Sequence, residues 1–347
     1  MSRHRSPPRS QSFRYHAPSE FPLLAYMSFE SIKALVENDL RQVDQVIRNR
    51  LASDVVLINQ VAEYIIGSGG KRLRPLVVLV AAKACGCEGV RHAEAAAIIE
   101  FIHTATLLHD DVVDGSTLRR GRDTANEIWG NEASVLVGDY VYSRSFEMMV
   151  ALGDMRIMDV MASATNQIAE GEVLQLMNTH DPATTEERYF EVIYRKTAKL
   201  FEAGTQVAAL LAGAPPSLEA SMAAYGKHLG IAFQLVDDVL DYSGSDQLGK
   251  NVGDDLAEGK PTLPLIHALR HGLPEQREII RASIEQGSVA ELPRITKAIE
   301  STGGLAYTAR LARREATLAI EALAELPASA YKQALRELAD FAVDRTY

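Results

Sequence analysis

The sequence predicts an all-α protein, a helical bundle of one domain around a deep central cavity, and three observations support this. From Phe29 onward Ala, Leu, Glu, Arg and Met dominate, and apolar residues recur at steps of three and four. No segment alternates apolar and polar residues between hairpin turns, and no repeat of fixed period occurs. No polar linker divides the pattern, so we expect one domain over residues 27–347.

The expected helices end at segments that contain glycine or proline, because these residues interrupt helices. The clearest interruptions are the G-S-G-G run at 67–70, Gly86, Asp181-Pro182 and Pro215-Pro216. With these boundaries, the helices are expected at residues 29–50, 54–66, 72–84, 91–113, 133–152, 155–179, 186–212, 217–242, 262–271, 275–286, 290–301, 303–325 and 329–345.

Residues 1–26 differ in character from the rest of the chain. They contain four arginines, four prolines and one glutamate, without a helical period and without the continuous apolar core of a secretory signal. The prolines argue against the amphipathic helix of a transit peptide. We expect a disordered basic tail, or an extension from an upstream start site, because Met27 opens the first well-patterned segment.

Composition restricts the classes of function. The chain has 36 basic and 46 acidic residues and a net charge of −10, which argues against a nucleic-acid partner. Its two cysteines, Cys85 and Cys87, cannot build a disulfide framework, so we expect reduced thiols and a cytoplasmic location. No apolar run reaches the length of about 18 residues that a membrane span requires.

A first acidic cluster, H-D-D-V-V-D, closes a strongly apolar helix. With about 100° of rotation per residue, Asp114 lies about 40° and Asp111 about 100° from Asp110. His103, two turns earlier, lies about 20° from Asp110, and the apolar stripe lies on the opposite side. This helix therefore has one core face and one face of carboxylates and an imidazole.

A second cluster repeats the D-D-x-x-D spacing at Asp237, Asp238 and Asp241, with Gln234 one turn earlier. Carboxylates at i, i+1 and i+4 destabilise a helix unless a cation neutralises them. Mg²⁺ suits such a site, because it binds one or two carboxylates together with waters and phosphate oxygens. A single cluster is as well explained as a solvated helix face, but two copies beside apolar stripes favour metal binding.

Basic residues accompany the acidic clusters, which is informative in an acidic protein. Taken singly, each could be ordinary surface charge; Arg119, for example, could simply pair with Asp111. Together they suit two diphosphates, one held through Mg²⁺ and one held directly by Arg and Lys. The cations in question are Lys71, Arg72, Arg74, Arg119, Arg120, Lys196, Lys250 and Lys260.

Six segments carry a resemblance to a known family: GGKRLRP, FIHTATLLHDDVVDGSTLRRG, EGEVLQL, KTAKLFE, AFQLVDDVLDY and GKNVGDDLAEGKPTLPL. From Met27 to its C-terminus the chain resembles the trans-polyprenyl diphosphate synthases, most of all the long-chain bacterial octaprenyl type. The resemblance implies an isoprenoid-synthase-type helical bundle, a homodimer and a prenyltransferase that uses two to three Mg²⁺ ions per active site.

The resemblance also implies roles for individual residues. Metal binding would fall to Asp110, Asp114 and Asp237, and the wider catalytic set would be Asp110, Asp111, Asp114, Asp237, Asp238, Asp241, Lys196, Thr197 and Gln234. The homoallylic diphosphate, isopentenyl diphosphate, would be bound by Lys71, Arg74, His103 and Arg120. The allylic diphosphate would be bound by Arg119, Lys196, Lys250 and Lys260, with Thr197 and Gln234 beside the developing carbocation.

The length of the product should depend on the space below the first acidic cluster. One turn before Asp110 lie Ala105 and Thr106, both small, where bulky aromatic residues would close a cavity early. Met149 and Met161 could form a deeper, pliable floor, or could equally be core filler. We expect a long all-trans product, C40, grown from farnesyl diphosphate for a quinone side chain.

Several alternatives stay open at this point. A shorter-chain farnesyl or geranylgeranyl synthase would share both acidic clusters. A class I terpene cyclase would usually replace the second D-D-x-x-D by another metal motif and would not need Lys71 and Arg74. A silent partner subunit should have lost aspartates, and a structural scaffold would not respond to diphosphate. At most transient membrane contact is expected, for release of an apolar product.

Overall fold

The computed structural model describes residues 27–67, 71–119, 121–243 and 252–344, which are helical apart from one two-stranded hairpin and connecting turns. The tail 1–26 and two predicted site residues, Arg120 and Lys250, lie outside the described residues. The elements in chain order are α1 (Phe29–Leu35), α2 (Glu37–Leu51), α3 (Val56–Gly67), α4 (Leu73–Ala84), α5 (Arg91–Val113), β1 (Leu118–Arg119), β2 (Arg122–Asp123), α6 (Ala125–Trp129), α7 (Asn131–Leu152), α8 (Met155–Asn178), α9 (Glu186–Ile193), the π-helix η1 (Tyr194–Ala198), α10 (Lys199–Leu211), α11 (Pro216–Leu240), α12 (Asp254–Ala257), α13 (Leu263–His271), α14 (Pro274–Gln286), α15 (Leu292–Thr302), α16 (Gly304–Ala322) and α17 (Ala330–Asp344).

The predicted all-α fold is confirmed, with local differences. The expected helix 29–50 is interrupted at Val36, whose φ of −125° and ψ of 25° are not helical. The expected helix 186–212 divides into α9, η1 and α10. The β1–β2 hairpin and the short helices α6 and α12 have no counterpart in the prediction, because elements of two to five residues are too short to show a hydrophobic period.

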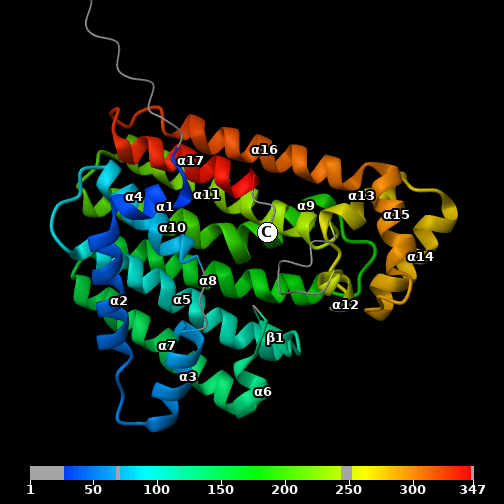
Figure 1. Cartoon of the computed structure of the whole chain (residues 1–347), viewed down its shortest axis with the longest axis horizontal. Helices are drawn as coiled ribbons and strands as arrows, with labels where there is room; N and C mark the ends of the chain where they lie inside the picture. The colour runs from blue at the N-terminus through cyan, green and yellow to red at the C-terminus, as the bar shows by residue number, and fades with distance from the viewer. Residues whose placement is uncertain (1–26, 68–70, 120, 244–251, 345–347) are drawn as a thin grey trace, which may run out of the picture.

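The long helices lie beside one another in the middle of the molecule (Figure 1). α11 packs against α10 and α16, and α5 packs against α7, α4 and α2. Figure 1 shows α16 and α17 along one side, α3, α6 and α7 along the opposite side, and α13, α14 and α15 at one end. No helix of the described ranges combines the length and apolar character needed to cross a bilayer.

Helix α5 forms the centre of the largest apolar cluster. Ile98, Phe101, Ile102 and Leu108 are at most 1% exposed, because neighbouring helices cover α5 on several sides. Burial of one large apolar side chain contributes about 1.5–3 kcal/mol to stability. The helix is therefore firmly anchored up to the point where its last turn, at residues 110–114, reaches the central cavity.

Candidate active site

The two acidic clusters lie at the C-terminal ends of α5 and α11, and both ends face the same cavity. Asp110 and Asp114 line it from α5, and Asp237 and Asp241 line it from α11. The cavity encloses about 1590 Å³ of empty space, including its open mouth. The sequence predicts these four carboxylates as site residues, and the fold brings them together from segments more than 100 residues apart.

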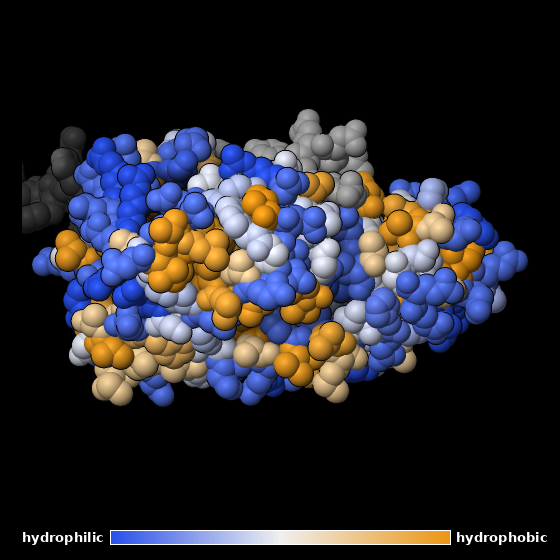
Figure 2. All heavy atoms as spheres, turned by 90° about the horizontal axis from the view of Figure 1, so that it is seen from below, coloured by the Kyte–Doolittle hydropathy of each residue, from blue (hydrophilic) through white to orange (hydrophobic). Residues whose placement is uncertain are grey.

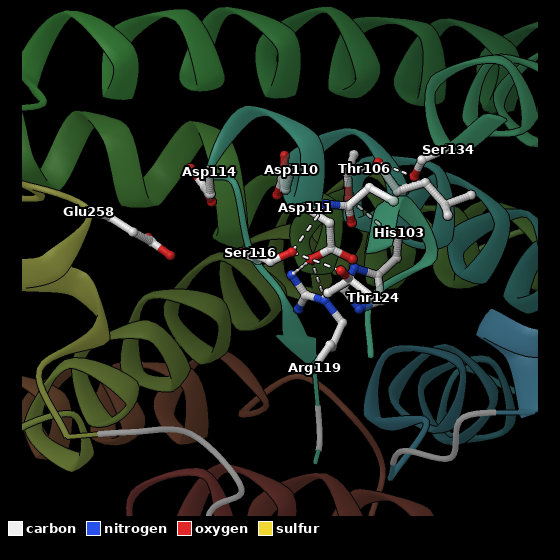
Figure 3. A network of polar contacts seen from close by, with 12 residues as sticks. His103, Thr106, Asp110, Asp111, Asp114, Ser116, Arg119, Thr124, Ser134 and Glu258 are labelled. Atoms are coloured by element: carbon white, nitrogen blue, oxygen red, sulfur yellow. Dashed lines mark hydrogen bonds and ion pairs between the residues drawn. The ribbon is translucent and has the colours of Figure 1, made fainter. Parts of the chain in front are cut away.

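The middle residue of the first cluster has a different environment. The Asp111 side chain is fully buried, and one of its oxygens accepts hydrogen bonds from Arg119 Nε (2.8 Å) and from a terminal guanidinium nitrogen (2.6 Å). Figure 3 shows Asp111 turned towards Arg119, whereas Asp110 and Asp114 point away from it. Burial raises the pKa of Asp111 and the guanidinium lowers it in part. Its position indicates that it holds the β1 segment against α5.

The second cluster repeats this arrangement. Asp238 is 1% exposed and accepts hydrogen bonds from Tyr189 Oη (2.5 Å) and Gln234 Nε2 (2.9 Å). Burial, followed by the nearby Asp255 carboxylate, raises the pKa of Asp238 to about 8. The Oγ1 of Thr197 donates to Gln234 Oε1 at 3.0 Å, so one hydrogen-bonded chain joins η1 to α11 and α9.

Two lysines in the cavity wall form ion pairs with the first cluster. Lys196 Nζ lies 3.4 Å from Asp110 Oδ2, and Lys260 Nζ lies 2.8 Å from Asp114 Oδ2. Burial opposes the charge on each lysine, but the surrounding carboxylates outweigh it and raise the pKa of both. Both lysines are therefore charged at neutral pH, as expected for groups that bind a diphosphate.

The π-helix η1 determines where Lys196 and Thr197 point. A π-turn inserts one residue into a helix and is frequent at functional sites. Two glycines allow neighbouring helices to approach it: a Cβ on Gly171 of α8 would lie 2.7 Å from Lys196 N, and one on Gly230 of α11 would lie 2.5 Å from Ala198 Cα. The turn is thus packed tightly between α8 and α11.

The residues predicted to bind the homoallylic diphosphate are only partly brought together. Arg74 donates to His103 Nε2 at 3.1 Å, and its guanidinium lies 4.7 Å from the centre of the Phe201 ring. Arg74 and His103 both line the same cavity as the acidic clusters. Lys71 is exposed, and its ammonium lies 5.1 Å from the Phe341 ring of α17.

The carboxylates fit the chemistry of Mg²⁺, although no group of three ligating side chains stands ready for a metal in the ranges described. Asp110 and Asp114 are instead paired with Lys196 and Lys260. Mg²⁺ does not need a complete protein cage, because it keeps waters and phosphate oxygens alongside one or two carboxylates. The residues are therefore suited to a metal that arrives together with a diphosphate.

A second, mainly apolar cavity of about 1790 Å³, including its mouth, adjoins the first. Thr106 lines both cavities at their junction, together with Asp110, Asp114, Glu172 and Lys260. Apolar side chains on its wall include Val113, Ile168 and Leu176. The other residues predicted to set product length, Ala105, Met149 and Met161, are at most 1% exposed and pack within the main core.

Three residues in or beside these cavities have no role that the sequence analysis predicts. Glu172 lines both of them, Glu258 the apolar one, and Tyr189 contacts Asp238. Glu172 and Glu258 lie in E-G-E and E-G-K segments, where a glycine beside an acid was the available signal. Tyr189 could not be recognised, because nothing in its sequence neighbourhood indicates a partner 49 residues away.

Comparison with known proteins decides the family. The polyprenyl synthetase profile matches residues 55–300. The chain belongs to the polyprenyl synthetase family. It is similar to the octaprenyl diphosphate synthase of Escherichia coli K12, with 54% identity over 92% of this chain and 99% of the relative. This polyprenyl synthetase is also 47% identical to the geranyl-diphosphate-specific all-trans-nonaprenyl-diphosphate synthase of Rhodobacter capsulatus, over 91% and 98% of the two chains. It is accordingly a prenyltransferase.

Solved structures agree with the isoprenoid-synthase-type fold. The polyprenyl synthase of Caulobacter crescentus CB15, solved with calcium and isoprenyl diphosphate, superposes with a TM-score of 0.89 at 45% identity, over 93% of this synthetase and 99% of that chain. A decaprenyl diphosphate synthase from Rhodobacter capsulatus gives a TM-score of 0.87 at 43% identity, over 92% and 100%.

Proposed function

We propose that this polyprenyl synthetase condenses isopentenyl diphosphate units, with Mg²⁺, onto farnesyl diphosphate to give an all-trans C40 diphosphate for a quinone side chain. One observation carries the proposal: four carboxylates and two charged lysines line a cavity that opens, past Thr106, into a large apolar one. The first cavity suits diphosphates and is called the diphosphate cavity below. The second suits a growing hydrocarbon chain and is called the apolar cavity.

The residues divide the reaction between them. Asp110, Asp114 and Asp237 would hold Mg²⁺, which neutralises charge on the departing diphosphate when bound. Lys196 and Lys260 donate to the oxygens of that diphosphate, which favours breaking of the allylic C–O bond. The double bond of isopentenyl diphosphate then attacks the allylic carbon, and a proton passes to the released diphosphate, which regenerates an allylic product.

Other residues of the cavity hold the second substrate and protect the cation. Arg74, with His103 beside it, binds the isopentenyl diphosphate, so that its double bond is held near the allylic carbon. Thr197 and Gln234 present polar oxygens to the developing positive charge. Their place in a hydrogen-bonded chain with Asp238 fixes their orientation.

The relatives support a long product over a shorter one. Those 54% and 47% identical are named octaprenyl and nonaprenyl synthases, whereas a geranylgeranyl pyrophosphate synthetase structure from Pyrococcus horikoshii is 31% identical. The calcium and isoprenyl diphosphate named for the Caulobacter structure support a divalent cation beside a diphosphate.

A product assay tests the proposal. Incubation with farnesyl diphosphate, isopentenyl diphosphate and Mg²⁺ should yield a C40 alcohol after dephosphorylation and chromatography, and chelation by EDTA should abolish it. Asp110→Ala should lower kcat by roughly 10²–10³-fold, as expected when one electrostatic group of an active site is removed. The exposed Asp159→Ala on α8 is the control. Full turnover with EDTA, or a normal rate for Asp110→Ala, would refute the metal assignment.

We also propose a homodimer, because large apolar side chains are exposed on neighbouring helices. Leu136 and Val150 of α7 are each 67% exposed, and Ile128 of α6 is 44% exposed. Figure 2 shows apolar patches on the side where α3, α6 and α7 lie in Figure 1. Contiguous exposed apolar surface marks protein–protein or membrane contact.

Sedimentation of the purified protein tests the dimer. The wild type should sediment as a particle of twice 38.0 kDa, and Leu136→Glu with Val150→Glu should shift it to the monomer. Val289→Glu, at an exposed apolar residue between α14 and α15, is the control. A monomeric wild type would contradict the dimer and would leave the apolar face for membrane contact.

The cytoplasmic location and the boundary at residue 27 remain predictions.

A further inference from the structure

Each cavity lysine lies between two carboxylates. Lys196 Nζ is 2.5 Å from Glu172 Oε2 on one side and 3.4 Å from Asp110 Oδ2 on the other. Lys260 Nζ repeats this arrangement between Glu258 Oε2 and Asp114 Oδ2. We propose that Glu172 and Glu258 are positioning residues that hold the two ammonium groups at the cavity wall. This inference rests on the proposed role of both lysines in binding the allylic diphosphate.

The two glutamates are separate from the diphosphate residues already assigned. Glu172 comes from α8, one residue after the glycine that packs against η1, so its carboxylate reaches the ammonium of a different element. Lys196 and Glu172 are 20% and 29% exposed, and a contact of 2.5 Å is that of a charge-assisted hydrogen bond. Burial raises the pKa of Glu172 to about 7 while Lys196 lowers it; the short contact favours describing the two as an ion pair.

The second pair is anchored through its backbone. Glu258 and Lys260 flank a glycine whose carbonyl accepts a hydrogen bond of 2.9 Å from His180 N. His180 Nδ1 donates to Ile284 O at 2.9 Å, which fixes this residue against the end of α14. Lys260 N donates to Asp255 O at 2.8 Å. Figure 3 shows Glu258 approaching the site from this neighbouring segment, on the Asp114 side of α5.

The consequence concerns the moment at which a ligand occupies Asp110 and Asp114. A lysine side chain has four rotatable bonds and loses considerable conformational freedom when it is fixed. If the aspartates were its only partners, it would become free to rotate whenever they turned to another ligand. The glutamates remain as second partners, so each ammonium stays in place to meet the diphosphate.

The same helix supplies a matched control. Glu170, two residues before Glu172, pairs with Arg195 on the outer side of η1 and lines neither the diphosphate cavity nor the apolar cavity described above. Glu170→Ala therefore removes a similar ion pair, between the same two elements, without touching a cavity lysine. A general loosening of α8 against η1 would affect both variants alike.

Steady-state kinetics of the full chain with Mg²⁺ test the proposal. Glu172→Ala and Glu258→Ala should each raise KM for farnesyl diphosphate about tenfold, with a smaller change in kcat and in KM for isopentenyl diphosphate. The glutamine variants keep a hydrogen-bond acceptor and should be intermediate, and Glu170→Ala should match the wild type. Calorimetric titration with inorganic diphosphate and Mg²⁺ should rank the diphosphate affinities of these variants in the same order.

A double variant identifies how the glutamate acts. Glu172→Ala added to Lys196→Ala should cause no further loss, because the residue acts only through that lysine. Additive losses, or an unchanged KM and diphosphate affinity in folded Glu172→Ala and Glu172→Gln, would overturn the positioning role. If Lys196→Ala alone left both unchanged, the assignment of the lysine to the diphosphate would itself fail. Circular dichroism verifies folding in each case.

Discussion

Asp111 and Asp238 occupy equivalent places in the two acidic clusters, and both are buried against a hydrogen-bond donor. Arg119 contacts the first, and Tyr189 with Gln234 contacts the second. The outer aspartates of each cluster line the cavity instead. The D-D-x-x-D spacing therefore combines two tasks: the outer carboxylates face the cavity, and the middle one holds the surrounding segments.

The sequence could give the direction of these side chains and, as one alternative, the pairing of Arg119 with Asp111, but not the elements that cover them. The helical wheel separates Asp111 from Asp110 by about 100°, and this is the direction in which Asp111 points to Arg119 (Figure 3). What covers Asp111 is the β1–β2 hairpin, an element too short to predict. For Asp238 the covering residue, Tyr189, comes from another helix altogether.

The buried Asp238 should make stability depend on pH. Its pKa is raised to about 8, whereas an unfolded aspartate ionises near pH 4, at about 3.9. The folded state thus binds more protons between these values, so the free energy of unfolding should fall as pH rises from about 4 to 8. Asp238→Asn has no carboxyl group at this position, so its free energy of unfolding lacks this dependence on pH.

Thermal unfolding in EDTA measures the effect. The Tm of Asp238→Asn minus that of the wild type should become more positive from pH 4 to pH 8 and then level off. Two curves that stay parallel over this range would show that Asp238 is ionised throughout in the folded protein.

At the scale of elements, η1 shows how packing determines local structure. The sequence from 186 to 212 has a continuous helical pattern, and a five-residue π-turn within it leaves no mark in composition. The turn lies where Gly171 and Gly230 allow α8 and α11 to approach it closely. Its position therefore depends on two segments distant in sequence, which a local pattern cannot reveal.

Gly171→Ala should displace this turn. The added Cβ would lie 2.7 Å from Lys196 N and 2.8 Å from Arg195 Cβ, so the backbone has to move. We expect overpacking to cost about 1–3 kcal/mol of stability and KM for farnesyl diphosphate to rise. Gly67→Ala, where nothing lies within 4 Å, is the control. Unchanged urea unfolding and kinetics for Gly171→Ala would contradict the close packing.

At the scale of the whole molecule, the fold class and most helix boundaries were predictable because long amphipathic helices dominate the chain. Helix α5 begins and ends at the predicted residues 91 and 113. The family resemblance, and not the helical pattern, implies the convergence of α5 and α11, since periodicity gives the faces of a helix but not its neighbours. The two adjoining cavities follow from that convergence and could not be seen in either motif alone.

Thr106→Tyr should shorten the product, because Thr106 lies where the diphosphate cavity meets the apolar one. A tyrosine there would block a growing chain after few additions, while the first condensation continues. Chromatography of dephosphorylated products should show a shift from C40 to shorter alcohols. The rate of the first condensation with isopentenyl diphosphate should be similar to that of the wild type. Thr317→Tyr, on the exposed side of α16, is the control. An unchanged product would remove Thr106 from the chain path.

In the proposed function, the two acidic clusters together hold the metal that binds the allylic diphosphate. A crystal grown with Mn²⁺, which carboxylates bind much as they bind Mg²⁺, and with the unreactive thio-analogue of farnesyl diphosphate tests it most directly. If the clusters hold the metal, anomalous density should lie within bonding distance of Asp110, Asp114 and Asp237 and of the diphosphate oxygens. Analogue bound elsewhere, or no anomalous density between α5 and α11, would show that the clusters do not hold it.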